Sequence, residues 1–134
     1  MPLLTRTPAT EGLPPAWKLA LGDAPSDEAA HAALEKLLET GAGRTLVELD
    51  PGGDVRTWRV ELCEVCPIMK WRAPSPGVFD VSLSKTTLKA LTELWELVLE
   101  GGSEYSFEVL DLTQGPNNGA QTFLTLAPRA QLTS

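Results

Sequence analysis

The sequence contains little of what most active sites and disulfide-linked folds are built from. Its 134 residues include one histidine, two cysteines and one tyrosine, and aromatic residues make up 6% of the chain. Two cysteines are too few for a disulfide framework, so we expect a reducing, cytoplasmic environment. A catalytic triad or another device that depends on an imidazole would have to use His31, and no nucleophile is apparent in its vicinity.

Long apolar runs and basic residues are also scarce. No apolar run approaches the length that crosses a bilayer, so we expect no membrane segment. Prolines interrupt the first fifteen residues, which lack a basic region followed by an apolar stretch, and a secretory signal is therefore not expected. The 11 basic and 18 acidic residues give a formal net charge of −7. This balance disfavours unspecific attraction to nucleic acid or to anionic lipid.

What the sequence does contain is typical of one globular domain. Hydrophobic residues make up 43% of the chain and charged residues 22%, values that argue against wholesale disorder. We expect residues 1–25 to form an extended N-terminal arm with one short strand at 17–21, and residues 26–134 to form a single domain. No internal repeat is visible in the sequence.

The hydrophobic pattern predicts two helices. The first begins at Ser26, a favourable N-cap, and stops at Gly41; the second covers residues 85–100 and is capped by Ser84. Alternating segments between turn-forming runs predict strands at 44–49, 55–65, 68–72, 78–83, 104–112 and 120–127. The order is arm–α–β–β–(β)–β–α–β–β. It predicts an α+β fold with a largely antiparallel sheet of about five strands, because no strand–helix–strand series recurs.

The most motif-like segment is Cys63-Glu64-Val65-Cys66. A redox-active CxxC has its first cysteine at a helix N-terminus, where the thiolate is stabilised, but this pair ends a predicted strand. A zinc site needs four ligands, and the chain offers two cysteines and one histidine. We expect Cys63 and Cys66 to be ordinary buried thiols. A metal site shared across a dimer and redox chemistry are the alternatives.

The second predicted helix has more apolar surface than one sheet can cover. At about 100° per residue its main apolar residues span roughly 140°, and two more widen the arc to about 200°. A helix on one sheet needs a stripe somewhat over 100° wide. We therefore expect the flank formed by Ala90, Leu94 and Leu97 to be a protein interface covered by a second subunit. The alternative is that the arm or the first helix of the same chain covers it.

Three of the four tryptophans stand beside a cation. Exposed rings next to positive charge are what single-strand binders use to stack bases. Along a strand, however, neighbouring residues face opposite ways, so most of these pairs are expected to be core beside surface. Trp71, between Lys70 and Arg72 and next to a proline-rich loop, is the one ring we expect to be available to a nucleic acid.

Residues 57–100 carry a local resemblance. The segment Ile68-Met69-Lys70-Trp71-Arg72, a Pro/Ser/Gly loop, and then Phe79 to Ser84 leading into a helix resembles part of the coactivator-type and whirly-like single-stranded DNA-binding proteins. This resemblance implies a curved antiparallel sheet with a helix, assembly into dimers or larger rings, and binding of single strands. The family's basic surface is not evident in this sequence, and another hairpin follows the helix.

Together these patterns predict a non-catalytic binding or assembly protein that acts through protein–protein surfaces, as a homo-oligomer or with another protein. No cofactor is expected. Single-stranded nucleic-acid binding is the alternative, and a CxxC metal or redox protein comes third. An enzyme is not expected, because neither a nucleophile–base pair nor a complete metal-ligand set is visible.

Overall fold

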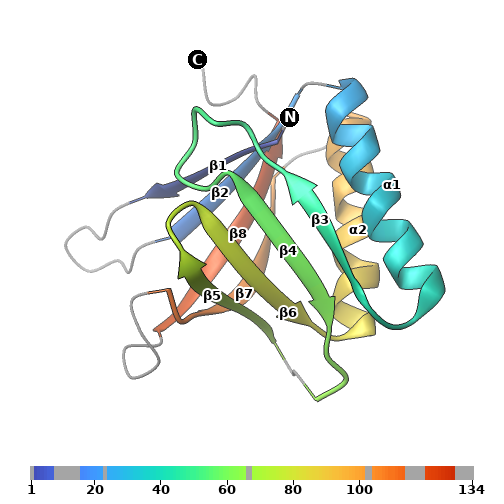
Figure 1. Cartoon of the computed structure of the whole chain (residues 1–134). Helices are drawn as coiled ribbons and strands as arrows, with labels where there is room; N and C mark the ends of the chain where they lie inside the picture. The colour runs from blue at the N-terminus through green and yellow to red at the C-terminus, as the bar shows by residue number, and fades with distance from the viewer. Residues whose placement is uncertain are drawn as a thin grey trace.

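The computed structural model describes residues 2–7, 16–22, 24–65, 68–101, 104–113 and 120–128. Within these residues it has two helices and eight strands (Figure 1). The helices are α1 (Ala24–Thr40) and α2 (Lys85–Leu99). The strands are β1 (Leu3–Thr7), β2 (Ala16–Leu21), β3 (Arg44–Glu48), β4 (Thr57–Leu62), β5 (Met69–Ser75), β6 (Val78–Leu83), β7 (Tyr105–Asp111) and β8 (Ala120–Pro128).

The predicted α+β class with two helices is confirmed, but the predicted sheet is wrong in size and in direction. The described strands form one mixed sheet in the order β1-β2-β8-β7-β5-β6-β4-β3, curled into a half-barrel. Four neighbouring pairs are antiparallel and three are parallel: β2 with β8, β4 with β6, and β5 with β7. Alternation within a segment predicts a strand but does not say which distant strand lies beside it, and for this reason the parallel pairs were missed.

The segment expected to be an extended arm belongs to the sheet. The strand predicted at residues 17–21 is β2, and β1 pairs with it in antiparallel register. Leu4, Trp17 and Leu19 are buried in the same core as residues from the rest of the chain. The apolar character of the N-terminal segment is therefore explained by its place in the half-barrel.

The element order contains one unit twice, although the sequence shows no repeat. Both β1–β2–α1–β3–β4 and β5–β6–α2–β7–β8 follow the order ββαββ. The strand pairings make β1, β3, β5 and β7 run in one direction, so these four strands, each followed by its hairpin partner, all end on the same side of the half-barrel. Both helices lie at the other end (Figure 1). We call these the hairpin end and the helix end.

At the hairpin end, the turn between β3 and β4 covers the outer edge of β1. The carbonyl oxygens of Pro2 and Leu4 accept hydrogen bonds from the backbone N–H groups of Asp50 and Asp54, at 2.8 and 2.9 Å. This contact requires a glycine at position 53, because an added Cβ would lie 2.6 Å from the carbonyl oxygen of Leu4. The turn thus joins the two edges of the sheet, at the start of β1.

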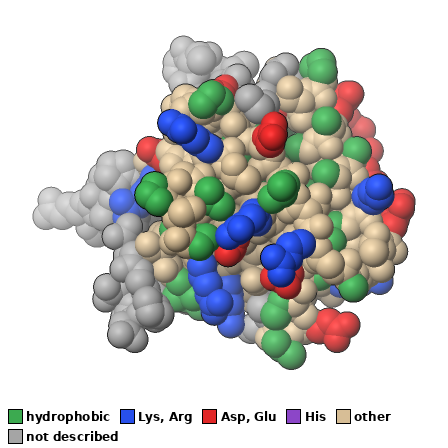
Figure 2. Space-filling model, viewed as in Figure 1, with side chains coloured by type: hydrophobic (Ala, Val, Ile, Leu, Met, Phe, Trp, Pro, Cys, Tyr) green, Lys and Arg blue, Asp and Glu red, His purple; other side chains and the backbone are tan. Residues whose placement is uncertain are grey.

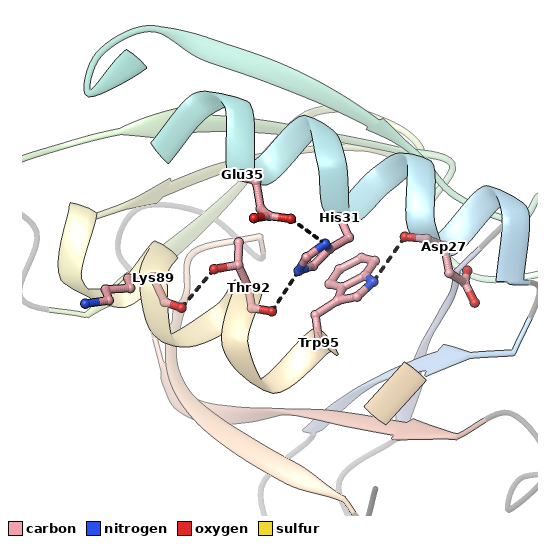
Figure 3. A network of polar contacts seen from close by, with 6 residues as sticks. All are labelled: Asp27, His31, Glu35, Lys89, Thr92 and Trp95. Carbon is pink, nitrogen blue, oxygen red and sulfur yellow. Dashed lines mark hydrogen bonds and ion pairs between the residues drawn. The ribbon is translucent and has the colours of Figure 1, made fainter. Parts of the chain in front are cut away.

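The helices pack on each other at the helix end (Figure 3). The indole N–H of Trp95 on α2 donates to the carbonyl oxygen of Asp27 on α1 at 3.2 Å. His31 on α1 places Nε2 3.0 Å from the carbonyl oxygen of Thr92, and its Nδ1 lies 2.9 Å from the Glu35 carboxylate. In the described part of the chain, neither helix combines the length and hydropathy of a membrane-spanning segment.

Candidate functional site

The hairpin end of the half-barrel contains a hollow of about 410 Å³. Its lining comes from the ends of several strands: Arg6 on β1, Trp17 on β2, Phe79 on β6 and Thr113 just after β7. The segment from Ala73 to Gly77, which is the end of β5 and the turn into β6, completes the described lining. Strand ends that meet at one end of a rigid sheet often carry a binding site. This hollow is the main candidate site.

The floor of the hollow belongs to an aromatic cluster inside the sheet. Trp17 and Phe79 are only 4% and 7% exposed, so they form the floor and not the walls. Their rings meet edge to face with centroids 5.1 Å apart, and Trp71 lies 5.3 and 5.6 Å from them. Trp58 adds an edge-to-face contact with Trp71 at 5.6 Å. These separations are those of favourable aromatic pairs, so the floor is a rigid apolar platform.

A buried carboxylate at the end of β7 holds this aromatic platform in place. Oδ2 of Asp111, at the end of β7, accepts the indole N–H of Trp17 at 3.0 Å. Oδ1 of Asp111 accepts from the backbone N–H and the hydroxyl of Thr113. Asp111 is 5% exposed, and burial of a carboxylate is tolerated where hydrogen bonds satisfy both oxygens. The orientation of the Trp17 ring is therefore set by β7.

The rim of the hollow is held in place by backbone hydrogen bonds. The carbonyl oxygen of Gly77 accepts from the backbone N–H groups of Arg56 and Thr57, at 2.8 and 3.0 Å. Gly77 has φ +78°, a conformation that strongly favours glycine, and a Cβ there would lie 3.7 Å from the side-chain carbons of Arg56. The turn from β5 into β6 is thus anchored at Gly77 to the start of β4, and the Arg56 side chain lies beside it.

The sequence placed Trp71 at the surface, and the structure corrects this. Trp71 has no exposed surface and belongs to the aromatic cluster. Its neighbours Lys70 and Arg72 lie on the opposite, outer face of β5, because side chains alternate along a strand. The three residues therefore do not form one surface, and Trp71 has no ring face to offer a base in this conformation.

The outer face of β3 to β6 carries mixed charge. Figure 2 shows lysine and arginine side chains with acidic ones beside them on this side of the molecule. Arg59 and Asp80 form an ion pair at 2.6 Å, and Arg44 and Glu61 form one at 3.8 Å. Acidic partners offset these two arginines, so the face is not the continuous basic surface that a phosphate backbone requires.

The flank of α2 that was predicted as an interface is partly covered. Ala90 and Leu94 are half-buried, and Leu94 packs against the core, whereas Leu97 is 43% exposed. Helix α1 contacts the other side of α2, near Thr92, which lies roughly 140° around the helix from Leu97. The first helix therefore does not cover Leu97, and self-association through this flank stays a prediction.

The remaining residues singled out from the sequence are dispersed. Cys63 is half-buried just after β4, and Cys66 lies outside the described residues. Within the described residues, no group of three or more His, Cys, Asp or Glu side chains lies close enough together to hold a metal ion. His31 lies between the two helices, where its ring contacts the carbonyl oxygen of Thr92 and the Glu35 carboxylate (Figure 3).

The residues of the hollow were not identified from the sequence. Arg6 and Trp17 were assigned to an arm, and Asp111 was one acidic residue among many. The available signal was the density of turn-forming residues at 73–77, which marks a loop at a strand end.

No family model matches the chain, and no curated protein or solved structure matches it either.

Proposed function

We propose that this protein is a non-catalytic binding protein that holds a small ligand in the hollow at the hairpin end. The observation that carries the proposal is the hollow itself, about 410 Å³ in volume and floored by Trp17 and Phe79. Small-molecule sites in proteins commonly have volumes of about 300–1,000 Å³, apolar linings and few polar groups. The helices occupy the other end of the half-barrel, so neither helix covers the hollow.

The lining favours binding over catalysis. Among the described residues that line the hollow, Arg6 is the one ionisable side chain, and an arginine is a poor general base because it stays protonated. The hydroxyl of Thr113 donates to the Asp111 carboxylate, but this carboxylate also accepts the Trp17 indole N–H and the Thr113 backbone N–H, so its role is to position these groups. The second lining hydroxyl, Ser75, lies at the exposed end of β5. The set therefore favours recognition over catalysis.

The test fills the hollow and measures binding of a neutral fluorescent probe, N-phenyl-1-naphthylamine. Ala73 is exposed and lines the hollow, so Ala73→Trp should place an indole in the space that the probe would occupy. The matched control is Ala29→Trp, because Ala29 is also exposed but lines a different hollow of about 290 Å³ between α1 and β3.

The proposal expects saturable binding by the wild type and by Ala29→Trp, and loss of binding in Ala73→Trp. Both variants change exposed alanines and should stay folded, which circular dichroism checks. Equal binding by Ala73→Trp and the wild type would refute the assignment of the hollow. Loss of binding in Ala29→Trp alone would place the site between α1 and β3.

Self-association through α2 is a second candidate function, compatible with the first. It is favoured by the exposed Leu97, which continues an apolar flank with Ala90 and Leu94. An apolar flank that extends beyond what the chain itself covers is a common feature of subunit contacts. Its test is described below.

A further inference from the structure

We infer that the ligand of the hollow is a small organic anion, with a flat apolar body against the Trp17–Phe79 floor and a carboxylate paired with Arg6. The inference rests on the proposed function and adds the chemical class of the ligand. It depends on a cation and an aromatic platform at the same site, which together recognise such a molecule.

Arg6 is placed to meet the charge of the ligand. It is exposed, and it lies directly opposite Trp17 in the β1–β2 register, so both residues belong to the face of the sheet that borders the hollow. Its backbone N–H is fixed by Oδ2 of Asp54 at 2.8 Å, which holds the residue at this position. None of the ion pairs formed among described residues includes the Arg6 guanidinium.

The nearby acidic groups among the described residues do not take this role from a ligand. The buried Asp111 carboxylate is fully engaged by Trp17 and Thr113. Asp54 is exposed and accepts the Arg6 backbone N–H, so it competes with a ligand only through a solvent-screened contact. Arg56, whose side chain lies beside Gly77 at the rim, adds a second positive charge. Two guanidinium groups therefore stand at the hollow beside these two engaged carboxylates, in a chain with a net charge of −7.

The residues that line the hollow favour a flat apolar body. Pro74 and Pro76 supply rigid apolar walls from the anchored turn, and the floor is aromatic. Apolar contact with such surfaces depends on area, whereas orientation would come from the Arg6 guanidinium. A planar ring system with one carboxylate would contact the aromatic floor and pair with the Arg6 guanidinium. A neutral molecule of the same shape would contact only the floor.

The test compares two probes of the same shape, naphthalene-2-carboxylate and the neutral naphthalene-2-methanol, by isothermal titration calorimetry at low salt. The wild type should bind the carboxylate about tenfold more tightly, the usual effect of one hydrogen-bonded charge pair. Arg6→Gln should remove this preference while leaving the affinity for the alcohol unchanged. Arg44→Gln changes the net charge equally but at the start of β3, at the helix end, and should keep the preference.

The outcomes separate the inference from the proposed function. If the alcohol binds as tightly as the carboxylate, or if Arg6→Gln keeps the preference, the hollow binds apolar molecules without selecting an anion, and only the inference is overturned. If neither probe binds the wild type saturably, the proposed function is overturned as well. If Arg44→Gln loses the preference as strongly as Arg6→Gln, the effect comes from net charge, and the assignment to Arg6 fails.

Discussion

Trp17 and Asp111, 94 positions apart in the chain, are joined by a hydrogen bond of 3.0 Å from the indole nitrogen to carboxylate oxygen Oδ2. Trp17 lies at the start of β2 in the first ββαββ unit, and Asp111 ends β7 in the second. Both side chains are almost completely buried. The bond therefore connects the two ββαββ units at the hairpin end, directly beneath the proposed ligand site.

Removal of this carboxylate should destabilise the fold. Asp111→Ala leaves the indole N–H of Trp17 and the groups of Thr113 without their acceptor, and we expect a loss of about 2–3 kcal/mol in the free energy of unfolding. Asp111→Asn keeps one acceptor oxygen and should cost about 1 kcal/mol. Urea unfolding followed by circular dichroism measures both values. Equal stability of Asp111→Ala and the wild type would show that the bond contributes nothing net.

The turn that covers β1 should depend on one glycine and not on its neighbour. Gly53→Ala would bring a Cβ to 2.6 Å from the carbonyl oxygen of Leu4, and the backbone would have to move to relieve the clash. We expect a loss of about 1–3 kcal/mol, as for other overpacked sites. Gly52→Ala meets only the Asp50 side chain, at 3.2 Å, and is the control. Thermal unfolding of both variants decides, and a larger loss in Gly52→Ala would contradict this account.

The local elements were accessible from the sequence because their signals are local. Ser84 was predicted as an N-cap, and it accepts a hydrogen bond from the backbone N–H of Thr87 at 3.2 Å. The alternation at 78–83 predicted a strand, and its alternate residues Phe79, Val81 and Leu83 are all buried in β6. The parallel pairs could not be predicted, because the strands that pair, such as β2 and β8, are far apart in the sequence and no local pattern links them.

The candidate site was hard to predict for the same reason. The lining residues come from four distant parts of the chain: Arg6, Trp17, Phe79 and Thr113. They become neighbours only when the sheet has formed and the ends of their strands meet at the hairpin end. Trp71 was singled out for its flanking charges, which say nothing about which face of a strand the ring occupies. The face of β5 that carries Trp71 is on the inside of the half-barrel, and so the ring that was expected to be exposed lies in the core.

The contact between the two helices offers a test of the helix end (Figure 3). Trp95→Phe keeps an aromatic ring on α2 but removes the N–H that bonds to the carbonyl oxygen of Asp27. We expect a loss of about 1–2 kcal/mol from the missing hydrogen bond and the smaller ring. Ligand binding at the hairpin end should not change, because the helices lie at the other end. Urea unfolding and calorimetry with naphthalene-2-carboxylate measure the two effects, and weaker ligand binding would show that the ends are coupled.

Self-association through α2 should depend on Leu97. Sedimentation velocity at micromolar concentration should show an oligomer for the wild type and a folded monomer for Leu97→Glu, because a buried carboxylate without a partner opposes the subunit contact. The matched control is Leu46→Glu. Leu46 is 61% exposed on the outer face of β3, away from the α2 flank, so this variant should stay oligomeric.

The alternatives give different patterns in the same experiment. Leu97 is 43% exposed, and a glutamate there should cost the monomer little, so a Leu97→Glu variant that unfolds would show that the flank is part of the core. A wild type that is monomeric would remove the self-association proposal and leave ligand binding at the hairpin end untouched. If Leu46→Glu dissociates the oligomer and Leu97→Glu does not, the subunits meet through the outer face of β3. That result would move the interface to the sheet, because Leu46 is the large exposed apolar side chain on that strand.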